Sequence, residues 1–144
     1  MRRVNVLEHI ERLAGSPVWI GPALGATGFV AWVGLSVIGG YGAVESGFRL
    51  REAWDTDAYF YIGAPVMALA VAAAAFLHPE RAWRWSLWLV AGHQMGVLLL
   101  GLGMQSGLSL VILTLALGAL LAVLFAIPAF AGAEAARRLA ERVY

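Results

Sequence analysis

The chain has 144 residues, of which 61% are hydrophobic and only 13% are charged. A soluble domain of this size carries roughly twice that charged fraction, so the composition argues against a soluble fold and favours a protein of the lipid bilayer. The net charge of +1 gives no support for nucleic-acid binding. Because the sequence contains no cysteine, disulfide bonds, thiolate metal sites and cysteine nucleophiles are excluded.

The segment 1–15 mixes charged side chains with regularly spaced apolar ones. Val4, Leu7, Ile10 and Leu13 recur at the spacing of one helix face, which is typical of an amphipathic helix lying on a membrane surface. Charged residues between them interrupt the apolar run that a signal peptide needs. We therefore predict a retained cytoplasmic surface helix, with a frayed tail as the alternative.

Four apolar stretches are each long enough to cross a bilayer as a helix, which takes about 20 residues. They cover residues 18–40, 58–77, 85–103 and 108–131. The connections after the second and third stretches are short, which predicts that the helices they join are antiparallel neighbours. We predict an all-α integral membrane protein with four transmembrane helices in an up-down bundle. Residues 16–132 form this domain, and residues 133–144 continue as a cytoplasmic helical tail.

The second predicted helix has two local features near its start. Pro65 lies inside it and lacks a backbone N–H, which predicts a kink. Tyr59, Phe60 and Tyr61 precede the proline. Such a group is typical of the aromatic residues that gather where a helix meets the membrane surface.

The arginines predict the orientation of the four helices. Two lie in the first connection, at positions 49 and 51, and the other eight lie at positions 2, 3, 12, 81, 84, 137, 138 and 142. With four spans, those eight share one side of the membrane. The positive-inside rule then places both termini in the cytoplasm. We predict a multi-pass protein of the cytoplasmic (inner) membrane with an external loop at residues 41–57.

The external loop carries most of the charged side chains between helices, and it offers one candidate site. The candidate residues are Glu45, Arg49, Arg51, Glu52, Trp54, Asp55 and Asp57. Its carboxylates are ligands that Ca²⁺ accepts, whereas the interleaved arginines favour local ion pairs. Acidic residues just before a helix also cap it and interact favourably with its dipole. Capping and a cation or substrate site remain alternatives.

A second candidate site lies at the centre of the third apolar stretch, where His93 and Gln94 stand side by side. Polar side chains at membrane depth face protein or water. Glycines at the spacing of a close helix contact flank His93 and line the first helix, namely Gly21, Gly25, Gly28, Gly92 and Gly96. We expect the polar atoms to point into a packed seam, with Gln105 on the same helix face as Gln94.

Three functions remain open for these intramembrane residues. As hydrogen-bonding groups between helices, they fit a non-enzymatic subunit or accessory protein of a larger membrane complex. As the lining of a polar path, they fit an oligomeric channel or carrier for a small solute. As a ligand, His93 fits a haem- or quinone-binding redox protein. The sequence carries no catalytic motif and no metal motif, so no cofactor is predicted. The expected partners are the lipid bilayer and other membrane subunits or further copies of the chain.

Overall fold

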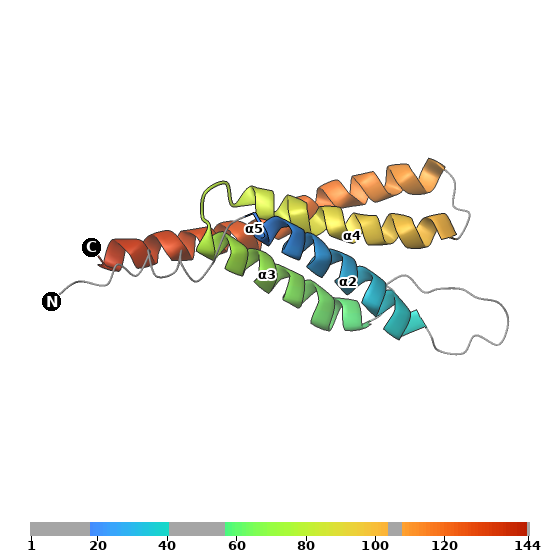
Figure 1. The fold of residues 1–144 in the computed structure, drawn as a ribbon, viewed down its shortest axis with the longest axis horizontal. Coiled ribbons are helices and arrows are strands. Elements are labelled where there is room, and N and C mark those ends of the chain that lie inside the picture. Colours follow the sequence, from blue (N-terminus) through green and yellow to red (C-terminus); the bar gives the residue numbers. More distant parts are fainter. Residues whose placement is uncertain (1–17, 41–56, 104–107, 144) are drawn as a thin grey trace.

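The computed structural model describes residues 18–40, 57–103 and 108–143. Within these ranges the chain is helical and contains no strand. The elements in order are α2 (Ile20–Gly40), a π-helical turn η2 (Tyr59–Gly63), α3 (Ala64–Leu77), α4 (Trp83–Gly103) and α5 (Leu108–Val143) (Figure 1). The prediction of an all-α protein is confirmed. The amphipathic segment 1–15 lies outside the described residues.

Three of these helical stretches are long and apolar enough to cross a membrane. They are Ile20–Ile38, Tyr59–Leu77 and Val111–Arg142, so the prediction of an integral membrane protein is supported by length and composition. α4 forms over the range expected for the third span, but it is not one of the three. The fourth span therefore stays a prediction.

Successive helices run in opposite directions along the molecule (Figure 1). α2 packs mainly on α4, α3 mainly on α5, and α4 also packs on α5. α3 and α4 share little contact, although a short connection joins them. This differs from the expectation that a short connection makes close neighbours. The reason lies in where the helix backbones are able to approach each other.

Glycines bring two pairs of helices into backbone contact. A methyl group added to Gly92 would overlap the carbonyl of Gly25, and one added to Gly28 would overlap the carbonyl of Leu89. These contacts join α2 to α4. In the same way, a methyl group on Gly132 of α5 would overlap the carbonyl of Ala72 of α3. Small residues allow this close approach, so they decide which helices pair.

The second predicted helix begins with a wide turn instead of a simple kink. The backbone N–H of Ala64 donates to the carbonyl of Tyr59, five residues earlier, which is the π-helical pattern. Pro65 follows at the beginning of α3, where its missing N–H is tolerated. The turn places Tyr59 in the core, whereas Phe60 and Tyr61 are exposed. Tyr59 therefore faces the other helices, while its place as the first residue of the candidate span Tyr59–Leu77 leaves the membrane-surface aromatic group a prediction.

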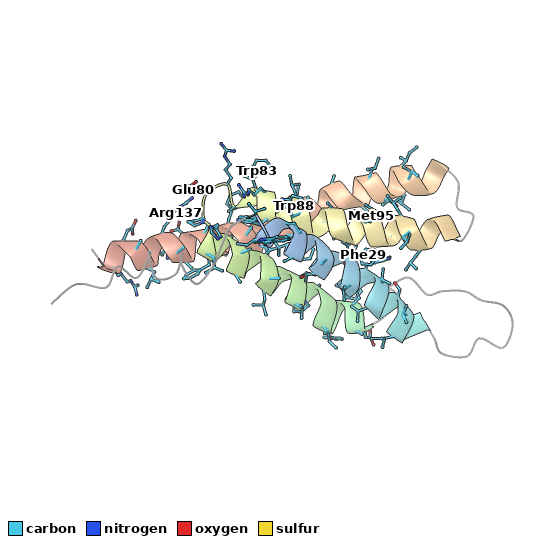
Figure 2. The ribbon with its side chains drawn as sticks, viewed as in Figure 1. Phe29, Glu80, Trp83, Trp88, Met95 and Arg137 are labelled. Atoms are coloured by element: carbon cyan, nitrogen blue, oxygen red, sulfur yellow. The ribbon has the colours of Figure 1, made fainter. Side chains whose placement is uncertain are left out.

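The core is apolar and the outer surface is largely apolar as well. Trp32, Met67, Val71 and Leu89 are buried, while many large hydrophobic side chains of α2, α3 and α5 point outward. Most of the described charged side chains belong to the α3–α4 connection, the start of α4 and the last turns of α5; Figure 2 labels Glu80 and Arg137 among them. There Glu134 accepts a hydrogen bond from Arg138 at 2.8 Å.

Candidate functional site

His93 lies at the midpoint of α4 with its side chain almost fully buried. Its Nε2 atom is 2.9 Å from the hydroxyl oxygen of Tyr59, the first residue of η2. Both groups are buried, so this hydrogen bond forms away from solvent. It ties the start of the second helix to the middle of the third.

Trp32 of α2 completes the cluster. The centroid of its indole ring lies 4.8 Å from that of the His93 ring and 5.9 Å from that of the Tyr59 ring, in edge-on arrangements. Such edge-to-face contacts stabilise aromatic groups beyond the burial of their area. The Trp32–Tyr59–His93 cluster thus joins three elements, α2, η2 and α4, at one point of the core.

The hydrogen-bonding capacity of this cluster is not exhausted. The Nδ1 atom of His93 is buried and has no hydrogen-bond partner within the described part of the chain. A buried polar atom without a partner costs free energy, and it is uncommon in folded proteins. One turn beyond Trp32, the hydroxyl of Ser36 is also buried and has no hydrogen-bond partner among the described residues. The core therefore holds polar atoms that a ligand or water is able to satisfy.

Gln94 points into a different seam from His93, because adjacent residues on a helix are about 100° apart. Its side chain packs on Gly118 of α5, where a methyl group would lie 3.1 Å from its Cγ. Neither atom of its amide has a hydrogen-bond partner among the residues described. The hydroxyl of Thr114, one turn before Gly118, is buried and likewise without a partner there.

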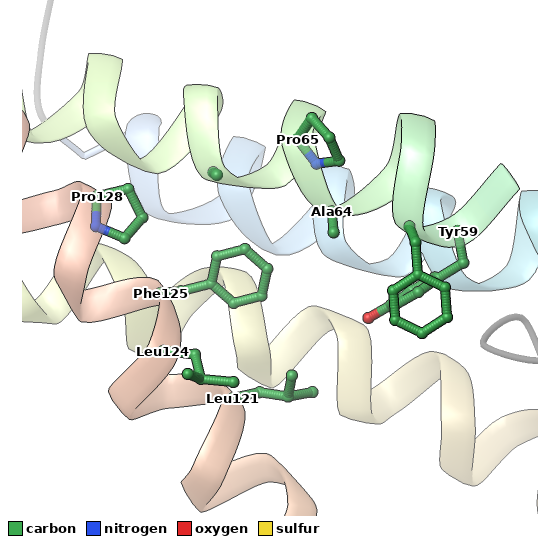
Figure 3. A pocket seen from close by; sticks show the side chains of 9 residues that line it. Tyr59, Ala64, Pro65, Leu121, Leu124, Phe125 and Pro128 are labelled. Carbon is green, nitrogen blue, oxygen red and sulfur yellow. The ribbon is translucent and has the colours of Figure 1, made fainter. Parts of the chain in front are cut away.

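Tyr59 also lines an apolar cavity between the second helix and α5. The cavity has a volume of about 420 Å³ and is lined by Tyr59, Phe60, Ala64, Pro65, Ala68, Leu121, Leu124, Phe125 and Pro128. In Figure 3, Tyr59 stands at one end of this lining and Pro128 at the other, with Phe125 facing Ala64 and Pro65 across the gap. Tyr59 is the one residue of this lining whose side chain carries a polar group.

The glycines chosen from the sequence lie along the α2–α4 seam. Gly25, Gly28 and Gly92 stand where the two backbones meet. A methyl group on Gly21 would lie 2.7 Å from the ring of Trp88, and one on Gly96 would lie 3.1 Å from the ring of Trp32. Gly96 therefore leaves the space that the indole of the cluster occupies.

Most residues of the external-loop candidate lie outside the described residues, namely Glu45, Arg49, Arg51, Glu52, Trp54 and Asp55, as does Gln105. Asp57 is described, and it is exposed two residues before Tyr59. No group of three or more His, Cys, Asp or Glu side chains that could hold a metal ion occurs within 18–40, 57–103 and 108–143.

Sequence reasoning gave Tyr59 a membrane-surface role but did not name it, Thr114 or Gly118 as a site residue. A tyrosine six residues before Pro65 was the available signal, since a proline early in a helix disturbs the preceding turn. The chain matches no protein-family model, and no match is found among curated proteins or solved structures. Function must therefore be argued from the geometry alone.

Proposed function

We propose that this chain is a four-span protein of the inner membrane that serves as a non-enzymatic subunit or accessory protein of a larger membrane complex. The observation that carries the proposal is a lateral, apolar groove on the outer side of α2. This groove has a volume of about 520 Å³ and is lined by Ala26, Thr27, Val30, Ala31, Gly34, Leu35, Ile38, Ile62, Gly63 and Val66.

The groove has the composition of a helix-binding surface. Small side chains such as Ala26, Ala31, Gly34 and Gly63 form much of its wall, and small residues are what lets a second helix approach closely in a bilayer. The same device joins α2 to α4 on the opposite side. A transmembrane helix of another subunit is the occupant that suits this shape.

The burial of α4 supports its assignment as the fourth span. Its two most polar intramembrane side chains, His93 and Gln94, face α2 and α5. Its outward side chains include Leu87, Met95 and Leu99, which suit lipid. The helix has 21 residues, or about 31 Å, which matches the hydrocarbon core of a bilayer.

The charge distribution supports cytoplasmic termini. The α3–α4 connection, which contains Arg81, and the start of α4, which contains Arg84, lie toward the same end of the bundle as the last part of α5, which contains Arg137 and Arg138 (Figure 1). Basic residues flanking transmembrane helices favour the cytoplasmic side. A reporter that works only in the cytoplasm should therefore be active when it is fused after the last residue. A reporter that works only outside the cytoplasm should be inactive at the same position.

Photo-crosslinking in the native host tests the subunit proposal. A photoreactive amino acid at Val30, inside the groove, should form an adduct with one defined membrane protein. Val123 of α5 is the matched control, because the exposed fraction of its side chain is 66% against 64% for Val30. The control position should give no such adduct.

Two results would contradict the proposal. One is an adduct from Val30 that contains only a second copy of this chain, which would assign the groove to self-association. The other is equal protein labelling from Val30 and Val123, which would show that the groove has no specific occupant.

A further inference from the structure

We propose that the segment 1–15 docks, as a helix of opposite direction, on one face of the last turns of α5. Ala136, Leu139 and Ala140 form this face, which we call the terminal face of α5. The segment itself lies outside the described residues, and its sequence predicts an amphipathic helix. The terminal face is separate from the groove on α2, so the docking does not depend on the proposed subunit role.

α5 continues beyond the helix that covers it. Ala72 of α3 meets Gly132 of α5, and the two helices run in the same direction (Figure 1). Because each residue advances both helices by the same distance, α3, which ends at Leu77, ends about level with Arg137. α5 continues to Val143. Figure 1 shows its last turns extending past the ends of the other helices.

The terminal face continues the side of α5 that packs on α3. Residues three, four and seven apart lie on one side of a helix, so Leu139 and Ala140 lie on the same side as Gly132 and Ala136. Ala136, at the border with α3, is buried, whereas Leu139 is 39% exposed. A large apolar side chain therefore stands beyond the end of α3 with no described helix alongside, which is the feature that a docked helix would cover.

The segment 1–15 joins the described chain at the end of the bundle where this face lies. The described residues start at Val18, and α2 starts at Ile20. Gly21 meets the ring of Trp88 near the start of α4, and that start lies toward the same end as the last part of α5 (Figure 1). Fifteen residues of helix span about 22 Å, which is longer than the terminal face. A segment attached this close has a high effective concentration, which a separate protein lacks.

One antiparallel register matches the apolar residues of the segment and of the terminal face. Val4, Leu7 and Ile10 are spaced by three residues, as are Ala136 and Leu139. The register that sets Leu7 against Leu139 also sets Ile10 against Ala136. Apolar residues that meet at such regular spacings are what holds two antiparallel helices together.

The charges beside the two apolar faces are complementary in the same register. Arg137 borders the terminal face, because it lies about 100° around the helix from the middle of that face. Glu8 and Glu11 border the apolar face of the segment at the same edge, on either side of the level of Arg137. Arg137 lies 3.8 Å from Glu134, a longer contact than the 2.8 Å between Glu134 and Arg138. Its guanidinium is therefore able to pair with a closer carboxylate, and such edge charges set the direction of helix pairs.

Docking would also connect two helices that otherwise stay apart. α2 packs on α4, and α5 packs on α3 and α4, whereas α2 and α5 share little contact within the described ranges. A segment that precedes α2 and lies along α5 would fix the ends of both helices relative to each other. On the membrane surface, the other position that its sequence suits, the segment would leave Leu139 uncovered.

Disulfide crosslinking in the full-length chain tests the docking, because the sequence has no cysteine of its own. Leu7→Cys is combined with Leu139→Cys in lipid nanodiscs, and the protein is treated with copper phenanthroline. We expect a disulfide within one chain, since the Cβ atoms of facing residues come close enough for the bond. Leu7→Cys with Glu141→Cys is the matched control, because Glu141 is exposed and lies about 200° around the helix from Leu139. It should react at least about tenfold more slowly.

Three outcomes would overturn the proposal. If neither pair reacts, the segment lies elsewhere, as it would on the membrane surface. If both pairs react at the same rate, the segment moves past α5 without docking. If the disulfide of the first pair links two chains, the terminal face is an interface between copies instead of a site for the chain's own segment.

A charge exchange checks the register without relying on a single cysteine pair. Arg137→Glu should slow the reaction between Leu7→Cys and Leu139→Cys about threefold, because exposed charges act weakly but now repel. Adding Glu8→Arg and Glu11→Arg to that variant should restore the rate. Equal rates in all three proteins would contradict the register. None of these results depends on crosslinking from Val30, so failure of the docking leaves the subunit proposal standing.

Discussion

Glycines bring the backbones together in both helix pairs of this protein, but only one of the two pairs stays closely packed beyond those glycines. Along α2–α4, Gly25, Gly28 and Gly92 bring the backbones into contact at two places about one turn apart. Along α3–α5, Gly132 makes one such contact with Ala72, and the helices then separate around a cavity. The wide turn η2 and Pro128 lie on the open side. The first pair thus forms a closed seam, and the second encloses a cavity.

The closed seam should give the largest effect on stability. Gly92→Ala places a methyl group against the Gly25 carbonyl, and it should lower the free energy of unfolding by about 3 kcal/mol. Thermal unfolding in detergent measures the loss. Gly34→Ala is the matched control, because its methyl group would lie 4.0 Å from the nearest side-chain atom, on Val30. An equally large loss in Gly34→Ala would contradict the idea of a closed α2–α4 seam.

The α3–α5 pair, which opens around the cavity, allows the same kind of substitution. Gly132→Ala should also destabilise the protein, because its methyl group meets the Ala72 carbonyl. We expect a smaller loss of about 2 kcal/mol, since this single contact has the neighbouring cavity into which the helices are able to relax. A loss larger than that of Gly92→Ala, measured by the same unfolding assay, would reverse the comparison.

The two polar neighbours on α4 should respond in opposite directions. His93→Leu breaks the bond to Tyr59 and should destabilise the protein by about 1–2 kcal/mol. Gln94→Leu removes amide atoms that have no partner in the described chain, so it should leave stability unchanged or raise it by about 1 kcal/mol. Urea or thermal unfolding of both variants checks this. If the two variants lower the free energy of unfolding equally, the Gln94 side chain makes an interaction as stabilising as the hydrogen bond of His93.

The smallest effect should come from the charged end of α5. Glu134 bonds to Arg138, but both side chains are about half or more exposed, and exposed ion pairs contribute little. Glu134→Gln should leave the midpoint of thermal unfolding within experimental error. A clear drop would indicate that this end packs against something that the isolated chain does not show.

Much of the helical framework was predictable from residue patterns alone. The apolar stretch at 85–103 corresponds to α4 (Trp83–Gly103), and the stretch at 18–40 corresponds to α2 (Ile20–Gly40). Long apolar runs bounded by charges or short connections indicate such helices well. Because membrane crossing depends on length and composition, the membrane character was also predictable.

The pairing of helices and the role of Tyr59 were not predictable in the same way. The α3–α5 pairing involves a contact between Ala72 and Gly132, which are 60 positions apart in the sequence. The burial of Tyr59 depended on a π-helical turn, which changes the face that a residue presents by adding one residue to a turn. From the sequence alone, an aromatic group at the start of an apolar run does not reveal which of its members faces the core.

The hydrogen bond between Tyr59 and His93 is the centre of this description, and a double-mutant cycle measures it most directly. Tyr59→Phe, His93→Leu and the double variant are unfolded in the same detergent. The bond predicts a coupling energy of about 0.6–1.7 kcal/mol, from the average to the largest value of such cycles inside a membrane protein. Effects that add to within about 0.3 kcal/mol would contradict it, because residues without an interaction behave independently.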